Sequence, residues 1–169
     1  MTIKLYAQPY NMDAEGFFFR SAEEYEQKSS GLKDRYGQLV EEFEIQFIDG
    51  EAIDAAFAEA VGLNQVNFKR FLELVEDWED HEKIRFILAV GECGYEFDLD
   101  KDDIDLLDVD IYEETSMRDL AINFVESGLF GEVPEAFHFY IDYDAIARDL
   151  SVDYSETSVA GMNLIYRCG

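Results

Sequence analysis

The sequence combines a net charge of −26 with a 48% share of hydrophobic residues, and these two properties constrain each other. Acidic disordered chains lack apolar side chains, because without them burial cannot offset the entropy lost on ordering. This chain contains 14 Phe, 10 Tyr and 1 Trp among 169 residues, which is enough to build hydrophobic cores. The sequence therefore predicts a folded body that holds carboxylates at fixed surface positions.

The charge balance favours some partners and disfavours others. Acidic side chains number 39 against 13 basic ones, and self-repulsion at this density lowers stability, so a function is expected to require it. Nucleic-acid binding depends on Lys and Arg that release counterions from phosphates, and scattered cations provide no basic stripe. Anionic membranes would repel the chain as well. The first hypothesis is occupation of a cationic DNA-binding groove, and enhanced solubility or a salty habitat is the alternative.

The termini and cysteines indicate a cellular compartment. Residues 1–6 contain no apolar signal region, and no apolar run approaches ~18 residues. Cys93 and Cys168 lie far apart in the sequence and show no metal or redox spacing. We therefore expect a soluble, cytoplasmic protein without disulfides.

Apolar periodicity and turn residues divide the chain into three small units. We expect an α+β domain at residues 1–60, a mainly helical acidic domain at 61–104 and a second α+β domain at 105–169. Units this small would expose much surface, so the predicted fold is an elongated α+β chain of three units.

The boundaries of the expected elements follow from capping residues, glycines and alternation. The expected strands span residues 3–10, 40–48 and 108–112, with a hairpin at 157–167. The expected helices span residues 21–27, 54–61, 82–90, 115–127 and 141–150, with one more after Asn64 that presents Phe68, Phe71, Leu72, Val75 and Trp78 on its apolar face and a further one that follows Pro134.

Ten carboxylates form the candidate acidic surface. Some lie on the polar face of the helix after Asn64, where like charges are three to four residues apart. The others lie in an acidic stretch, residues 92–114, that holds eleven Asp or Glu and one Lys. The full set is Glu73, Glu76, Asp77, Asp80, Asp98, Asp100, Asp102, Asp103, Asp105 and Asp108.

The alternating acids that begin at Asp98 have the spacing of a calcium-binding loop, but the rest of that motif is missing. An EF-hand requires Gly at its sixth position and a bidentate Glu at its twelfth. Asp103 and Val109 occupy these positions, so the motif is excluded.

Other patterns of site chemistry are absent from the sequence. His81 and His138 are isolated from each other and from the cysteines, and we expect a solvated and a structural role for them. The chain has no glycine-rich phosphate loop and no nucleophile elbow. The sequence thus predicts no catalytic residue, no metal and no cofactor, and it gives no case for an enzyme.

Motifs in the last third of the chain carry a family resemblance. Residues 126–135 (ESGLFGEVPE), 140–145 (YIDYDA) and 147–150 (ARDL) closely resemble the ArdA family of antirestriction proteins, and the GEVP loop with the YIDYxAxxRDL stretch is its most recognisable signature. The match is strong over residues 119–154. In the N-terminal unit, Tyr10, Asn11 and a displaced Gly16 are all that resembles the family pattern.

The resemblance implies a fold, a function and a partner. ArdA proteins are elongated three-domain DNA mimics, encoded largely on mobile genetic elements, that inhibit type I restriction-modification enzymes and form homodimers through the C-terminal domain. The ten carboxylates would then replace phosphates in the enzyme's DNA groove and block DNA binding, cleavage and modification. Residues in or near the GEVP loop would form the dimer interface or, alternatively, pack within one protomer: Phe130, Val133, Phe137 and Tyr140.

Two functions of other classes remain open. One is a DNA mimic aimed at a different cationic DNA-binding protein, and the other is an acidic adaptor or chaperone for basic proteins. Geometry distinguishes the adaptor, because a mimic requires carboxylates along a curved line at phosphate-like intervals and an adaptor requires only a patch.

Overall fold

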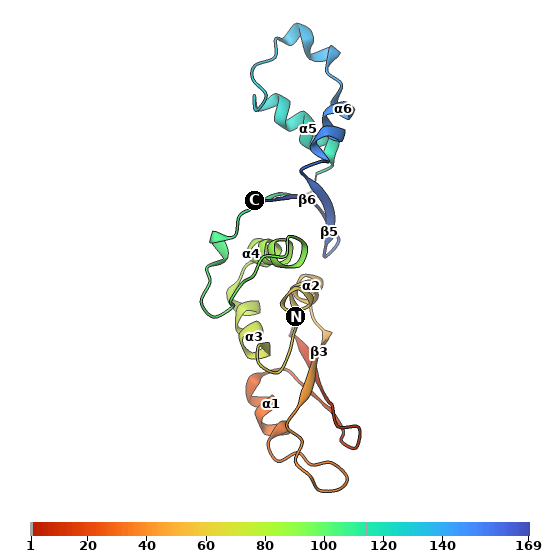
Figure 1. The fold of residues 1–169 in the computed structure, drawn as a ribbon, viewed down its shortest axis with the longest axis vertical. Helices are drawn as coiled ribbons and strands as arrows, with labels where there is room; N and C mark the ends of the chain where they lie inside the picture. Colours follow the sequence, from red (N-terminus) through yellow and green to blue (C-terminus); the bar gives the residue numbers. More distant parts are fainter. Residues whose placement is uncertain (1, 114) are drawn as a thin grey trace. The chain divides into compact units, whose positions relative to one another are not determined.

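The computed structural model describes residues 2–113 and 115–169, which divide into two compact units, Met1–Leu107 (unit 1) and Asp108–Gly169 (unit 2). Each unit combines helices with a three-stranded antiparallel sheet, which confirms the α+β prediction (Figure 1). The division into three domains stays a prediction.

Unit 1 contains three strands and a series of helical segments. Its elements are β1 (Lys4–Pro9), β2 (Phe17–Phe19), α1 (Ala22–Ser29), β3 (Phe43–Asp49), α2 (Ala52–Val61), α3 (Phe68–Asp77), α4 (Asp80–Phe86), the π-helix η1 (Ile87–Glu92) and the 3₁₀ helix η2 (Ile104–Leu106). The sheet order is β2-β1-β3, so the first strand is central.

The sheet of unit 1 shows the predicted alternation. Leu5 and Ala7 of β1 are buried, as are Phe43 and Ile45 of β3, while Glu44 between them is exposed. One face of the sheet therefore forms a core and the other meets solvent. Gly16 stands immediately before β2, where a side chain would collide with the carbonyl oxygen of Ala7.

Aromatic rings fill the core of unit 1 in two groups. Beside the sheet, Tyr25 of α1 lies 4.6 Å from Phe68 of α3 and 5.1 Å from Phe19 of β2, between ring centroids. Farther along, Phe57 of α2 lies 5.3 Å from Phe71 of α3 and 5.2 Å from Phe86 of α4. Through these rings α3 packs against both the sheet and the helices.

The helices after Asn64 differ in two respects from the expectation. On α3, Phe68, Phe71 and Leu74 are the fully buried residues, whereas the predicted Leu72, Val75 and Trp78 are only partly buried. The buried face is thus centred on Phe71, since Phe68 and Leu74 lie about 60° to either side of it at 3.6 residues per turn. The helix expected at 82–90 is α4 followed by a π-helical turn, which buries the consecutive residues 87–89.

Unit 2 contains β4 (Val109–Glu113), α5 (Met117–Glu126), the 3₁₀ helix η3 (Glu135–Tyr140), α6 (Tyr143–Leu150), β5 (Ser155–Val159) and β6 (Met162–Cys168). Its sheet order is β4-β6-β5. The predicted hairpin is confirmed, and its turn places Ala160 and Gly161 at φ values of 51° and 82°. Two successive positive φ values match the twist of the paired strands.

The core of unit 2 lies between its sheet and α5. Ser116 caps α5 by accepting a hydrogen bond from the backbone N–H of Asp119. Leu120 and Phe124 of this helix pack with Tyr154 and Ile165, all buried. The helix expected at residues 115–127 is therefore confirmed, and it packs one apolar face into this core.

The expectation of a disulfide-free chain is wrong. Neither cysteine is a free thiol, because Cys93 and Cys168 are both disulfide-bonded. Disulfide formation depends on where Cβ atoms lie in the folded chain, and sequence spacing does not reveal this.

A buried ion pair joins two helices of unit 1. Lys83 Nζ of α4 lies 2.7 Å from Asp54 Oδ1 of α2, and the two side chains are only 7% and 5% exposed. Such a deeply buried charge is tolerated because the opposite charge of its partner compensates for the hydration that the ion loses on burial.

We expect Lys83→Met to lower the free energy of unfolding by about 3–5 kcal/mol, because it leaves the Asp54 charge buried and unpaired. Chemical denaturation followed by circular dichroism measures this change. The double variant Lys83→Met/Asp54→Leu should recover most of the loss. A single variant as stable as the wild type would contradict the assignment.

Candidate functional site

All ten candidate carboxylates are exposed in the structure. Nine belong to unit 1, and Asp108 belongs to unit 2. None is needed to fill a core, so all of them are available to solvent or to a partner.

One part of the acidic surface lies on α3 and at the start of α4. Glu73, Glu76 and Asp77 lie on the face of α3 opposite its buried Phe71 and occupy about 6 Å of helix axis at 1.5 Å per residue. Duplex DNA carries one charge per about 1.7 Å of axis, so the local density is comparable.

Most of these helical carboxylates lack an ion-pair partner in the described part of the chain. Among the residues that the structure describes, Glu76, Asp77 and Asp80 form no ion pair, whereas Glu73 Oε2 lies 2.9 Å from Arg70 Nη1. Three uncompensated carboxylates therefore follow one another where α3 ends and α4 begins.

The other part lies on the acidic loop, residues 93–103, between η1 and η2. Its carboxylates order its own backbone: Asp98 Oδ1 accepts from the N–H of Asp100 at 3.0 Å, and Asp102 Oδ2 accepts from the N–H of Asp98 at 2.7 Å. Asp103 Oδ1 likewise accepts from Asp105 N at 3.0 Å and caps η2. The loop thus has a defined conformation without forming a regular helix or strand.

Asp98 is the carboxylate of this loop with a clear pKa shift. The hydrogen bond from the backbone N–H of Asp100 lowers the pKa of Asp98 below its ordinary value, and Lys101 Nζ at 3.4 Å adds to the effect. The side chain stays ionised under all conditions near neutrality.

Unit 2 exposes a cluster of apolar residues around η3. Phe130, Phe137 and Tyr140 are 56%, 58% and 82% exposed, and Val133 is partly buried. Pro134 precedes η3, and a ring nitrogen of His138 lies 2.9 Å from the carbonyl oxygen of Val133. The 3₁₀ helix stands where an ordinary helix was expected after Pro134.

An open apolar cavity of about 350 Å³ lies beside this cluster in unit 2. Asp149 and Asp153 contribute to its edge, and its apolar lining is formed by Val125, Phe130, Val133, Ile141, Ile146 and Leu150. The side chains of this chain leave the cavity unfilled, so it can accept an apolar group.

The described residues give no arrangement for metal chemistry. Within residues 2–113 and 115–169, no three His, Cys, Asp or Glu side chains are grouped so that they could hold a metal ion.

In the same ranges, no helix has the length and apolar composition that a bilayer crossing requires.

Comparison with known proteins identifies the family. A family model described as "Antirestriction protein (ArdA)" matches residues 11–162, nearly the whole chain. The chain belongs to the ArdA family. A search of curated proteins found no match. Membership supports an antirestriction function and implies a restriction-modification protein as the target.

The ArdA signature maps onto the apolar cluster of unit 2. Its GEVP loop leads into η3, and the stretch that contains Tyr143 to Leu150 forms α6, which lines the cavity. Sequence reasoning found Phe130, Val133, Phe137 and Tyr140 through this signature, but it missed the cavity. The sequence carried no signal for it, because its lining comes from residues on α5, α6 and the intervening loop.

Asp98→Ala should loosen the acidic loop at neutral pH and change it little in acid. Because the folded-state pKa of Asp98 is lowered, its contribution is present above the ordinary pKa and is lost as the pH falls through the folded value. Protection factors for the Asp100 amide, measured by hydrogen exchange at pH 6 and at a pH well below the folded-state pKa of Asp98, should therefore differ between variant and wild type only at the higher pH.

Asp77→Asn is the matched control for this measurement, since Asp77 is exposed on α3 and accepts none of the hydrogen bonds that order the loop in the described part of the chain. It should leave the Asp100 amide unchanged at both pH values. Equal protection in Asp98→Ala and wild type at pH 6 would show that the carboxylate does not order the loop.

Proposed function

We propose that this ArdA-family chain inhibits type I restriction-modification enzymes by occupying their DNA-binding groove as a DNA mimic. One observation carries the proposal: all ten candidate carboxylates are exposed, and nearly all of them lie on helices or on the acidic loop, whose backbone is held by hydrogen bonds. An acidic adaptor or chaperone for basic proteins would need no such order. The proposal also agrees with the family description.

The inhibition would be competitive occlusion. Carboxylates would replace phosphates as partners of the Lys and Arg side chains that line the enzyme's DNA channel. Opposite fields would accelerate encounter, and binding would weaken as salt screens the charges. DNA binding, cleavage and modification would all be blocked, and no catalytic residue or cofactor of the inhibitor would take part.

The basic test is competition for a purified type I methyltransferase with a labelled target duplex, over a series of salt concentrations. Near-stoichiometric protein should displace the duplex, and less completely as salt rises. No displacement at large excess and low salt would refute this target. Displacement from an unrelated cationic DNA-binding protein, tested in parallel, would favour the broader mimic.

A group of carboxylates should matter more than any single one. The triple variant Glu76→Gln/Asp77→Asn/Asp80→Asn should weaken inhibition about tenfold, since exposed ion pairs contribute roughly 0.5 kcal/mol each. Each single substitution should change it by about two- to threefold. The competition assay at low salt measures both.

A matched triple variant separates geometry from net charge. Glu15→Gln/Glu41→Gln/Glu42→Gln also removes three exposed carboxylates of unit 1, but from loops outside the candidate surface. The concentration of this variant that displaces the duplex should stay within about twofold of that of the wild type. If both triple variants lose the same affinity, the protein acts as a charged patch, and the adaptor hypothesis is preferred.

We further propose that the chain forms a homodimer through unit 2. Three of the four candidate interface residues are more than half exposed in the single chain, and aromatic side chains of this kind are enriched at protein interfaces. The adjacent apolar cavity offers a place for an aromatic ring of a second copy. Two chains would carry twice −26, or −52, as many charges as the phosphates of about 26 base pairs.

The double variant Phe137→Asp/Tyr140→Asp should be monomeric at concentrations where the wild type is dimeric, because it places charge on an apolar contact. Sedimentation velocity measures the mass, and circular dichroism should be unchanged since both side chains are exposed. Val152→Asp, an 83% exposed position elsewhere in unit 2, is the control and should leave the mass unaltered. A wild-type monomer would refute the dimer.

A further inference from the structure

Arg70 lies between two of the candidate phosphate-mimicking carboxylates. Its Nη1 is 2.9 Å from Glu73 Oε2, and its Nε is 3.7 Å from Asp100 Oδ1. A basic side chain at this point reduces the negative charge that a DNA groove would meet. Because the chain has only 13 basic residues, a cation placed here requires a reason other than charge.

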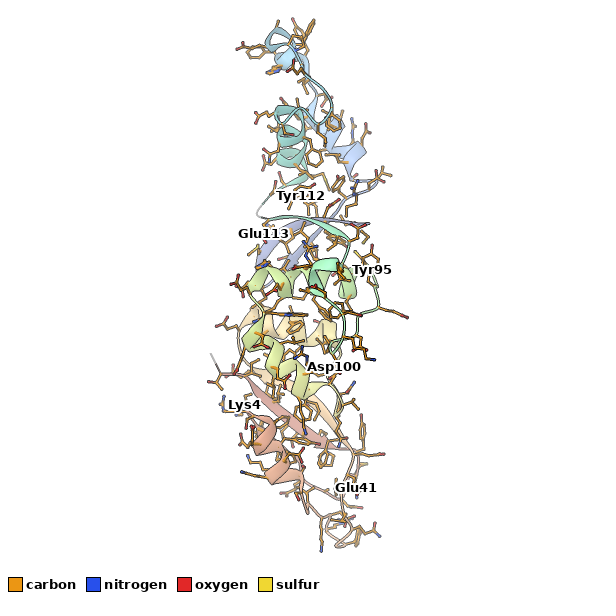
Figure 2. The ribbon with its side chains drawn as sticks, turned by 90° about the vertical axis from the view of Figure 1, so that its left-hand side faces the viewer. Lys4, Glu41, Tyr95, Asp100, Tyr112 and Glu113 are labelled. Atoms are coloured by element: carbon orange, nitrogen blue, oxygen red, sulfur yellow. The ribbon has the colours of Figure 1, made fainter. Side chains whose placement is uncertain are left out.

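A hydrogen bond to the main chain supplies that reason. Arg70 Nε donates to the carbonyl oxygen of Leu99 at 3.0 Å, in the middle of the acidic loop. The guanidinium group has five donors in a rigid plane, so it can hold Glu73 of its own helix and the loop at the same time. Asp100, labelled in Figure 2, is thereby kept beside α3.

Other contacts fix the two ends of the loop. Before Leu99, the ring of Phe97 packs against Phe86 and Trp78, with centroids 5.5 and 6.2 Å apart. After the loop, Ile104 is buried, and Arg85 Nη1 donates to the carbonyl oxygen of Leu107 at 2.9 Å. Among the residues that the structure describes, Arg70 is therefore the side chain from outside the loop that is seen to hold its centre.

The centre of the loop is also where repulsion is strongest. Asp98, Asp100, Asp102 and Asp103 lie within six residues, with Lys101 as their one basic neighbour in sequence. A charged segment of this kind repels itself and extends unless it is attached to the fold. The attachment at Leu99 opposes that extension.

We propose that Arg70 is a positioning residue for the acidic surface: it fixes the loop against α3 so that the carboxylates of the loop and of the helix keep one spacing. The inference rests on the proposed DNA mimicry and identifies the residue that sets its geometry. It implies that removing a positive charge from this protein weakens its binding to a positively charged groove.

The test compares two variants with the same net charge. Arg70→Gln and Lys33→Gln each make the chain more negative by one charge, and Lys33 is an exposed residue far from the loop in sequence. In the competition assay, Arg70→Gln should inhibit about tenfold less strongly than the wild type. Lys33→Gln should inhibit as strongly as the wild type or slightly more strongly. Arg70→Lys keeps the charge but cannot span both partners, and should fall between.

Two readouts separate positioning from a general loss of structure. The dependence of inhibition on salt should become shallower in Arg70→Gln, because fewer carboxylates engage the groove together. A partly unfolded preparation would instead reduce the active fraction and leave that slope unchanged. Hydrogen exchange should be faster at residues 98–103 and unaltered in β1 and β3.

The outcomes are distinct. Inhibition by Arg70→Gln equal to that of Lys33→Gln, with the same salt slope, would overturn the inference, and so would unchanged exchange at residues 98–103. If the wild type displaces no duplex, the proposed function fails by itself. Hydrogen exchange then still decides whether Arg70 holds the loop.

Discussion

Packing between aromatic rings is what allows a chain of this charge to keep its carboxylates in fixed places. In unit 1, Tyr25, Phe57 and Phe86 each contact two or more other rings, from the sheet, the helices and the acidic loop. Such pairs contribute about 0.5–1.5 kcal/mol beyond the burial of their area. Like charges three to four residues apart on a helix oppose folding by only about 0.2–0.5 kcal/mol each. The rings therefore outweigh the repulsion locally.

The elements that sequence reasoning predicted well are those governed by local periodicity. Alternation at β3, the glycine that ends α2 and the serine that caps α1 all act within a few residues, so the chain itself encodes them. The burial of Leu74 in place of Leu72 and the π-helical turn after Phe86 depend on neighbours far away in sequence. No local pattern contains that information.

The features of the candidate site also divide into those set by local sequence and those set by contacts between distant segments. Exposure of the ten carboxylates follows from amphipathic spacing and from their density, and the family signature pointed to the apolar residues around η3. The contacts of Arg70, the buried Lys83–Asp54 pair and the cavity of unit 2 each join segments separated by many residues. They become visible only when the tertiary structure brings these segments together.

In a chain where acids outnumber bases three to one, the basic residues carry more structural information than the acidic ones. Because acids are in excess, each cation could pair with one of several carboxylates. Three cations nonetheless pair with carboxylates that are distant in sequence: Lys83 with Asp54, Arg118 with Asp144 and Arg167 with Asp110. An exposed pair of this kind is worth at most about 1 kcal/mol, but it also removes a local repulsion. Loss of one acid subtracts one of many similar charges. Loss of a cation that lies between two carboxylates, as Arg70 lies between Glu73 and Asp100, would release both at once. The chain should therefore tolerate changes in its acids better than changes in its few arginines.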